Sequence, residues 1–375
     1  MLPRLVLLLG LLLPFAVRAD APPPPPIAAK AWLLMDTQSG AIVASQNADA
    51  RAEPASLTKL MTAYLVFSAL QQKKLTLDQT VNVSEKAWKI GGSRMFIEPR
   101  KPVTVDELLR GMVVQSGNDA TIALAEAVAG SEEVFAQMMN REGQRLGLKD
   151  TNFTNSTGWP DAKHYTTAKD LALMAAALIR DFPEYYGKYY SMKDYRYNNI
   201  TQPNRNRLLW LDQNVDGVKT GHTETAGYCL IASAKRGDRR MLSVVLGTAS
   251  DAARAQESQK LLNYGFQFFD TVRLFEANKP VGTVRVWKGA ENEAKAGMKS
   301  DLYVTVPKGE GDKLKADFVS RQPLMAPVNA GQQIGTVRVS LEGKQTGEYP
   351  ALALDSVPVA GIVGRLTDTV RLWLQ

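Results

Sequence analysis

Between positions 29 and 271 the spacing of apolar residues changes several times, and each change marks a new element. Apolar residues that recur every three or four positions predict helices, whereas short apolar runs between turn residues predict strands. The helical stretches are 57–70, 105–130 with a break near QSGND, 131–148, 166–182 and 252–270. The strand-like stretches are 32–35, 41–46, 227–237 and 239–250. Strands at both ends with helices between them predict an α/β (α+β) unit with an antiparallel sheet and a helical subdomain.

After about residue 271 the pattern changes to short stretches in which apolar and polar residues alternate. Gly, Pro and Lys turns separate these stretches, and the pentapeptide GTVRV occurs twice, at Gly282 and Gly335. Alternation with a period of two is typical of strands that are buried on one face. We therefore predict a small all-β domain over residues 272–356, following a domain over residues 29–271.

The last segment, residues 357–375, has helical spacing again. Its apolar residues recur on one side, and its charged residues Arg365, Asp368 and Arg371 fall on the other. Two interpretations stay open: a helix docked on its own protein, and an amphipathic helix lying in a membrane surface. The segment is too short and too charged to span a bilayer. Its terminal position, Trp373 and the arginines favour the surface helix.

The chain begins with a segment typical of export. Arg4 precedes an apolar run from Leu5 to Val17 and small residues follow, so residues 1–19 are predicted to be a secretory signal peptide. The alternative, an uncleaved membrane helix, needs about 20 apolar residues, and this run is shorter. Residues 20–28, which are rich in proline, are predicted to be extended and solvated.

Cysteine content and charge narrow the class of protein. Cys229 is the one cysteine in the sequence, so no internal disulfide is expected and stability depends on the buried core. It lies in an apolar strand-like run, where we expect a small buried residue rather than a catalytic thiol. The formal net charge is +7, and two arginines of the predicted signal peptide leave +5. This mild excess suits an anionic wall polymer or lipid surface, and without a recognition motif nucleic acid is not an expected partner.

The sequence gives little support for a histidine base or a metal site, so lysine is the remaining candidate for the base that activates a serine. His164, His222 and one cysteine offer no metal-ligand cluster, so no metal or other cofactor is predicted. The chain has no GxSxG motif and no pattern that supports a Ser-His-Asp triad. A serine nucleophile still needs a base within hydrogen-bonding reach. Ser56 and Lys59 lie one helical turn apart and can touch, and burial or a second cation would lower the lysine pKa as a base requires.

Three short motifs occur in order along the chain: SLTK from Ser56, SGN from Ser116 and KTG from Lys219. A lone S-x-x-K is common by chance, but the three together define the penicillin-recognising serine acyl-enzymes. The chain therefore resembles the D-alanyl-D-alanine carboxypeptidase family of low-molecular-mass penicillin-binding proteins. The likeness covers nearly the whole chain after the predicted signal, including the stretches NSTGW, HYTTAKDLALMA, NRNRLLW and VDGVKTGHTETAGYCLIASA.

This resemblance implies a fold, a reaction and a location. The fold is a penicillin-binding/β-lactamase-like catalytic domain, followed by a small β domain and an amphipathic tail that anchors the protein to a membrane surface. The reaction removes the terminal D-Ala from peptidoglycan stem pentapeptides through an acyl-enzyme, and β-lactam antibiotics act as covalent inhibitors. The location is the periplasmic side of the bacterial inner membrane.

The resemblance also implies which residues carry the reaction. Ser56 attacks the carbonyl of the penultimate D-Ala, and Lys59 takes the serine proton. Ser116 relays a proton to the departing D-Ala, and Asn118 orients Lys59 and the substrate amide. Water then hydrolyses the acyl-enzyme.

Further residues are implied in substrate binding. Lys219 supplies positive potential, Thr220 and Gly221 hold the substrate, and backbone N–H groups of the nucleophile and of His222 form the oxyanion hole. Arg254 pairs with the terminal carboxylate, which a guanidinium fits with two hydrogen bonds. Simpler interpretations stay open: Arg254 as a surface arginine, and the His222 ring without a role, because only its backbone is invoked.

Three other functions share parts of this pattern. A class A β-lactamase carries S-D-N and a separate glutamate for deacylation, whereas here the middle residue is Gly117 and no matching glutamate motif occurs. A DD-endopeptidase of the same fold is hard to separate by sequence. A non-enzymatic wall-binding protein is disfavoured, because the nucleophile, the base and both partner motifs are intact.

Overall fold

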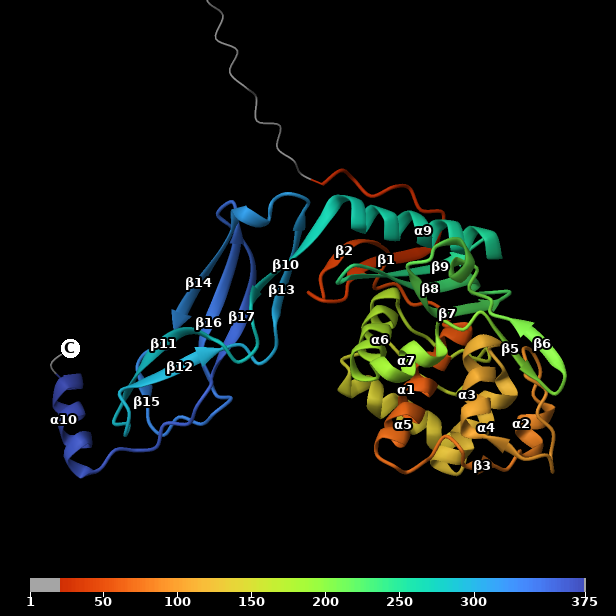
Figure 1. Ribbon diagram of the computed structural model, residues 1–375, viewed down its shortest axis with the longest axis horizontal. Coiled ribbons are helices and arrows are strands. Elements are labelled where there is room, and N and C mark those ends of the chain that lie inside the picture. Colours follow the sequence, from red (N-terminus) through yellow and green to blue (C-terminus); the bar gives the residue numbers. More distant parts are fainter. Residues whose placement is uncertain (1–20, 374–375) are drawn as a thin grey trace, which may run out of the picture.

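The structure is a computed structural model that describes residues 21–373. The predicted signal peptide, residues 1–19, lies outside the described residues. Figure 1 shows two lobes: a larger one of helices around a sheet, and an elongated one of strands that leads to α10 (Ile362–Trp373). The predicted order of the parts along the chain, an α/β part, then an all-β part and then a terminal helix, is confirmed.

The larger lobe is built on an antiparallel five-stranded sheet in the order β2-β1-β9-β8-β7. Its strands are β1 (Ala31–Asp36), β2 (Ile42–Gln46), β7 (Val215–Thr223), β8 (Gly227–Arg236) and β9 (Arg239–Thr248). Every residue of β1 is buried, and neighbours point to opposite faces: Leu33 belongs to one apolar cluster and Leu34 to another. The continuous apolar run of β1 therefore reflects a sheet covered on both faces.

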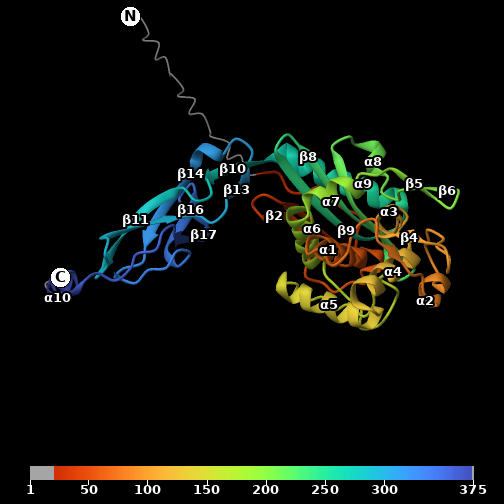
Figure 2. The same cartoon turned by 60° about the horizontal axis from the view of Figure 1, so that its bottom comes forward.

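Helices cover both faces of this sheet, as Figure 2 shows from a second direction. On one face α9 (Asp251–Phe268) packs Leu261 and Leu262 into a cluster with side chains of β1, β8 and β9. On the other face α6 (Ala168–Asp181) contacts β1 and β9, and α1 (Lys59–Gln71) packs on α6. In α1 every residue from Lys59 to Phe67 is buried, which is the pattern of a central core helix.

Further helices and two short pairs of antiparallel strands form the helical subdomain. Its helices are α2 (Glu85–Lys89), α3 (Val105–Val114), α4 (Asn118–Ala129), α5 (Glu132–Arg145) and α7 (Pro183–Tyr189). The short α8 (Leu208–Leu211) instead contacts β7 and belongs to the apolar cluster under α9. The strand pairs are β3 (Thr80–Val81) with β4 (Val103–Thr104), which α2 separates along the chain, and the hairpin of β5 (Asp194–Tyr197) and β6 (Ile200–Pro203). Thr167 caps α6: its side chain accepts a hydrogen bond from the Asp170 N–H, which fixes where the helix begins.

The elongated lobe is all β. A six-stranded sheet runs in the order β14-β16-β17-β12-β11-β15, beside a two-stranded ribbon of β10 and β13. The strands are β10 (Phe269–Phe275), β11 (Pro280–Trp287), β12 (Glu293–Gly297), β13 (Leu302–Pro307), β14 (Leu314–Ser320), β15 (Leu324–Met325), β16 (Gln333–Leu341) and β17 (Lys344–Ala353). The strands bury a separate apolar core, and β10 follows directly on α9 at Phe269.

The proline-rich leader is only partly as predicted. Its described residues form no helix or strand, but the segment is not fully solvated. Ile27 packs against the cluster under α9, and the Tyr264 hydroxyl donates a hydrogen bond of 2.7 Å to the Pro22 carbonyl oxygen. The Ala28 N–H donates to Glu257 Oε2 at 3.2 Å. Prolines lack a backbone N–H but keep an acceptor, so a neighbouring helix can still hold such a segment.

The terminal helix α10 exposes its apolar side. Exposed fractions are 79% at Val363, 64% at Leu366 and 85% at Trp373. Asp368 is buried on the opposite side, where its Oδ2 accepts a hydrogen bond of 2.7 Å from the Lys288 N–H in the β lobe. Among residues 21–373 no helix has the length and apolar character needed to cross a membrane.

A polar junction joins the two lobes. Asp36 at the end of β1 is fully buried and accepts hydrogen bonds from the hydroxyls of Thr271 on β10 and Thr305 on β13. Arg239 on β9 also donates to Thr271 Oγ1, at 3.0 Å. One carboxylate therefore links the central sheet to both strands of the ribbon.

We predict that Asp36→Ala weakens this junction, because two hydroxyls lose their buried acceptor. The free energy of unfolding should fall by about 1–3 kcal/mol, measured by thermal or urea unfolding. Asp238→Ala, in the exposed β8–β9 turn, is the matched control and should leave stability unchanged. A loss in the control equal to that of Asp36→Ala would contradict the assignment.

Candidate active site

Ser56 and Lys59 meet as their spacing predicts. Ser56 lies in a 3-10 turn (Ala55–Thr58) that leads directly into α1, so it precedes the α-helix rather than standing in its first turn. Lys59 is the first residue of α1. Its Nζ lies 2.9 Å from Ser56 Oγ, which is hydrogen-bonding distance.

The amine of Lys59 is almost completely enclosed. The residue is 1% exposed, and Nζ also donates to Asn118 Oδ1 at 2.8 Å and to the Thr157 carbonyl oxygen at 2.7 Å. Burial lowers the pKa of Lys59 to about 7, with help from the charge of Arg205, while Asp119 and Glu132 oppose the shift. A neutral amine has two N–H donors and one lone pair. With both donors occupied by carbonyl oxygens, the lone pair is left for the Ser56 hydroxyl proton.

Ser116 and Asn118 lie at the break between α3 and α4. Ser116 has a φ of +61° and is buried, and within residues 21–373 its Oγ has no hydrogen-bond partner. Asn118 holds Lys59 through Oδ1 and donates through Nδ2 to the Gly91 carbonyl oxygen at 2.8 Å. The predicted break in the helix therefore brings the Asn118 side chain to the Lys59 amine. It also leaves the Ser116 hydroxyl available for a proton transfer.

The KTG segment lies on β7, the edge strand of the sheet, and packs on the turn that carries Ser56. A Cβ at Gly221 would lie 3.1 Å from the Pro54 carbonyl oxygen and from Leu57 Cγ, so glycine permits this close approach. Lys219 is 3% exposed, and its Nζ donates to the Thr220 carbonyl oxygen at 3.1 Å. Burial lowers the pKa of Lys219, and the neighbouring charge of Lys59 lowers it further.

These elements surround a cleft of about 790 Å³. Of the predicted site residues, those that line the cleft are Ser56, Ser116, Thr220, Gly221, His222 and Arg254. Lys59, Asn118 and Lys219 lie behind this lining, buried in the protein. The two serines thus line the cleft, while the amines of Lys59 and Lys219 lie in the buried interior behind it.

Two of the simpler interpretations now have a structural answer. Arg254 is buried rather than on the surface: it donates to the Gly221 carbonyl oxygen at 3.2 Å and pairs with Asp251. The side chain of His222 is exposed and its ring lies 4.1 Å from the Tyr228 ring, at the edge of the cleft. Neither ring nitrogen of His222 makes a hydrogen bond described for residues 21–373.

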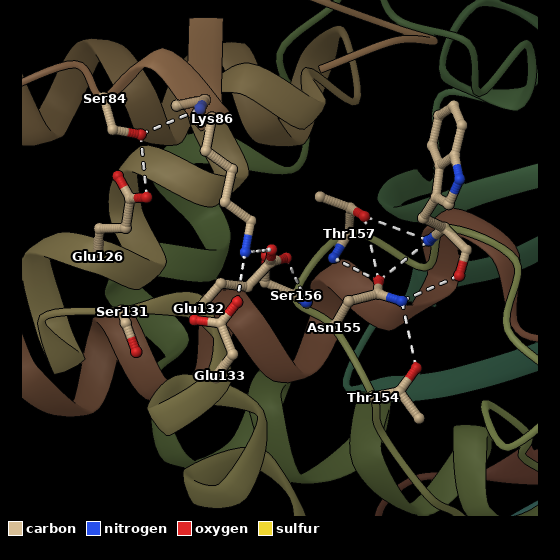
Figure 3. Close-up of polar contacts among 12 residues, drawn as sticks. Ser84, Lys86, Glu126, Ser131, Glu132, Glu133, Thr154, Asn155, Ser156 and Thr157 are labelled. Carbon is tan, nitrogen blue, oxygen red and sulfur yellow. Dashed lines mark hydrogen bonds and ion pairs between the residues drawn. The ribbon is translucent and has the colours of Figure 1, made fainter. Parts of the chain in front are cut away.

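The structure adds a loop that sequence patterns did not identify as part of the site. Asn155 Oδ1 accepts hydrogen bonds from the N–H groups of Thr157, Gly158 and Trp159, at 3.2, 2.8 and 3.0 Å, as Figure 3 shows in part. Gly158 has a φ of +83°, and a Cβ there would lie 1.7 Å from the Ala55 carbonyl oxygen. The loop therefore needs this glycine to bring the Thr157 carbonyl oxygen to Lys59.

Arg205 is a second addition. It lines the cleft from the NRNRLLW segment, and its charge contributes to the lowered pKa of Lys59 and of Lys219. No general chemical motif marks this arginine. Only the resemblance of the segment to a known family pointed to the region.

His164 supports the nucleophile turn from behind. Its Nδ1 accepts from the Thr154 N–H at 3.2 Å, which places the ring proton on Nε2, 2.9 Å from Thr58 Oγ1. Burial lowers the pKa of His164 to about 4. The ring is therefore neutral at pH 7 and links the 154–159 loop to the turn of Ser56.

Two family models of known proteins match this chain, one over the larger lobe and one over the strand lobe. A family model described as D-alanyl-D-alanine carboxypeptidase matches residues 17–250, and one described as the C-terminal domain of penicillin-binding protein 5 matches residues 269–359. The chain is 44% identical over 356 residues to the D-alanyl-D-alanine carboxypeptidase DacC of Escherichia coli, covering 93% of this chain and 89% of the relative. Identity to DacA of Haemophilus influenzae is also 44%, covering 94% and 91%.

Solved structures agree. Penicillin-binding protein 5 from Haemophilus influenzae superposes with a TM-score of 0.85 at 44% identity, over 90% of this chain and 99% of that one. Penicillin-binding protein D2 from Listeria monocytogenes, in its ampicillin-bound form, matches with a TM-score of 0.60 at 30% identity, over 65% of this chain and 100% of that one.

Burial of neutral His164 predicts a pH-dependent loss of stability. The folded pKa of about 4 lies below the ordinary value of 6.5, so between these values the unfolded chain binds the proton more tightly. Stability is fully present above pH 6.5 and falls by about 3 kcal/mol as the pH drops toward 4. Unfolding measured from pH 7 to 4 should show a steeper fall in the parent protein than in His164→Gln. Equal slopes would contradict this role.

Proposed function

This chain belongs to the D-alanyl-D-alanine carboxypeptidase family and is a serine-type carboxypeptidase of peptidoglycan, and on that premise we propose that Ser56 is its nucleophile and Lys59 its general base. The observation that carries the proposal is the set of three contacts around Lys59 Nζ. Two of them occupy its donors, and the third directs its lone pair at the nucleophile. A pKa of about 7 then gives a base that is half neutral near pH 7.

The proposed reaction proceeds through an acyl-enzyme. Ser56 Oγ attacks the carbonyl carbon of the penultimate D-Ala while Lys59 takes the hydroxyl proton. Ser116, whose Oγ has no other partner within residues 21–373, passes a proton to the amine of the departing D-Ala. Backbone N–H groups of Ser56 and His222 stabilise the charge on the carbonyl oxygen, and water later hydrolyses the ester.

We assign recognition of the terminal carboxylate to the cationic side of the cleft. Lys219, Thr220 and Arg254 lie on or behind the β7 side, and a carboxylate that enters there meets two buried cationic groups. An arriving negative charge raises the pKa of a buried lysine, and so opposes the lowering of the Lys219 pKa by burial. Asn118 orients Lys59 and the substrate amide.

Two related activities use the same acyl-enzyme chemistry. The names of the relatives favour the carboxypeptidase over a β-lactamase or a DD-endopeptidase. Because the Listeria relative is described in ampicillin- and cefotaxime-bound forms, we propose that β-lactams acylate Ser56 in this chain. We assign catalysis to the domain of residues 29–271, which is followed by the β domain of residues 272–356.

We propose further that residues 357–375 anchor the enzyme to the periplasmic side of the inner membrane after a signal peptide directs export. Ile362, Val363, Leu366, Val370 and Trp373 form an exposed apolar face on α10. Arg365 and Arg371 are exposed on the same helix, where they can pair with lipid phosphates. Asp368 holds the opposite side of the helix on the β lobe, which leaves the apolar face outward.

We predict that Ser56→Ala abolishes both covalent labelling by fluorescent penicillin and release of D-Ala from a pentapeptide ending in D-Ala-D-Ala. The fall should be at least about 10³-fold, because no other group replaces the nucleophile. Ser45→Ala on the exposed strand β2 is the matched control and should label normally. Labelling that persists in Ser56→Ala refutes the assignment. Rapid penicillin turnover without D-Ala release supports the β-lactamase instead.

Membrane attachment has its own test. Deletion after Ser356 should move the protein from the membrane fraction to the soluble fraction. In the full chain, Leu366→Ser combined with Val370→Ser should weaken binding to anionic lipid vesicles by about tenfold or more, because two apolar side chains lose their burial in lipid. Thr369→Ser is the control. A tail-deleted protein that stays in the membrane fraction rules out the anchor.

A further inference from the structure

Glu132 is a buried acid that the proposed reaction does not use. It is the first residue of α5 and is 6% exposed. Its Oε1 accepts two hydrogen bonds from Ser156, from the N–H at 2.9 Å and from the hydroxyl at 2.6 Å. Its Oε2 pairs with Lys86 Nζ at 2.9 Å. Figure 3 shows Lys86 reaching from α2 to this carboxylate, with Ser156 on its other side.

Ser156 leads straight to the general base. Its own carbonyl oxygen accepts a hydrogen bond of 2.7 Å from the hydroxyl of Thr62, one turn along α1 from Lys59. The carbonyl oxygen of the next residue, Thr157, accepts a hydrogen bond of 2.7 Å from Lys59 Nζ. Every polar group of Ser156 is therefore engaged, two by Glu132 and one by α1. A shift of this residue would move the Thr157 carbonyl oxygen.

We propose that Glu132, held by Lys86, is a positioning residue that fixes Ser156 and so aims the Thr157 carbonyl oxygen at the amine of Lys59. The chain of contacts runs from α2 to α5, then through the 154–159 loop to α1. This inference rests on the proposed role of Lys59 as the base. Through Glu132 and Lys86, the helical subdomain would thus control the position of the Lys59 amine.

The carboxylate also acts through its charge. Glu132 and Asp119 raise the pKa of Lys59, against the larger lowering by burial and the lowering by Arg205. The other charged groups around Glu132 are Lys86, Glu133 and Glu126. Although partial burial alone would lower the pKa of Lys86, its bonds to Glu133 and Glu132 raise it, so this lysine stays charged beside the buried acid.

Glu132 has two separate effects: its hydrogen bonds hold Ser156 in place, and its negative charge raises the pKa of Lys59. Different substitutions can test the two effects separately. A glutamine in its place keeps an oxygen that accepts from Ser156 but loses the charge and, with it, the ion pair with Lys86. An alanine loses both. Glu133 pairs with the same lysine at 2.7 Å and is 72% exposed at its side chain. The hydrogen bonds described for residues 21–373 join Ser156 to Glu132 and not to Glu133, which makes Glu133 a matched control.

The test uses the enzyme lacking only its signal peptide and measures the rate of acylation by a fluorescent penicillin from pH 5 to 9, together with thermal unfolding. In the parent we expect the rate to rise through the pKa of Lys59, near 7, to a plateau. In Glu132→Gln this rise should move to lower pH, because the Lys59 pKa falls when a nearby negative charge is removed, and the plateau should stay within about threefold of the parent.

In Glu132→Ala the rise should move in the same direction, and the plateau should fall roughly tenfold or more, because the Thr157 carbonyl oxygen is no longer held in place. Glu133→Gln should match the parent in both respects. Glutamine at position 132 should thus rescue the plateau that alanine loses, an effect that a merely stabilising residue would not produce.

Two results overturn the proposal. One is a Glu132→Gln profile that coincides with that of Glu133→Gln, and this variant decides the case if Glu132→Ala does not fold. The other is an alanine plateau equal to the glutamine plateau, even if the alanine variant unfolds at a lower temperature. If the parent itself shows no rise near pH 7, the assignment of Lys59 as the base fails instead.

Discussion

The removal of one lysine amine from water is the constraint on which the site depends. An amine in water is charged and donates in every direction, whereas Lys59 is enclosed and meets acceptors at fixed positions. Burial shifts its proton equilibrium to the range in which it can exchange a proton with a serine. The rest of the larger lobe can be understood as the packing needed to keep that amine dry and correctly surrounded.

That packing requires backbones to approach closely at points where a side chain would intervene. Gly158 lies against the carbonyl of Ala55, and Gly221 on β7 lies against the same turn from another direction. Segments that are distant in sequence thus converge on one short 3-10 turn, and Ser56 is held from several sides. Precision in such a site comes from the shapes of main chains at least as much as from side-chain contacts.

Much of this could be predicted from sequence, and the gaps have physical reasons. The helices and strands follow from the periodicity of apolar residues along the chain. Ser56 and Lys59 follow from helical spacing. The Thr157 contact could not be predicted, because it is made by a backbone carbonyl that any residue supplies. Arg205 and the docked leader depend on tertiary approach, which local spacing does not encode.

The absence of any loop between α9 and β10 has a mechanical consequence. The helix ends at Phe268 and the strand begins at Phe269, and Asp36 secures the same junction from the central sheet. A joint of this kind resists bending, so the strand lobe behaves as a stiff arm. The length of this lobe, rather than the reach of a flexible tether, then sets the distance between α10 and the catalytic cleft.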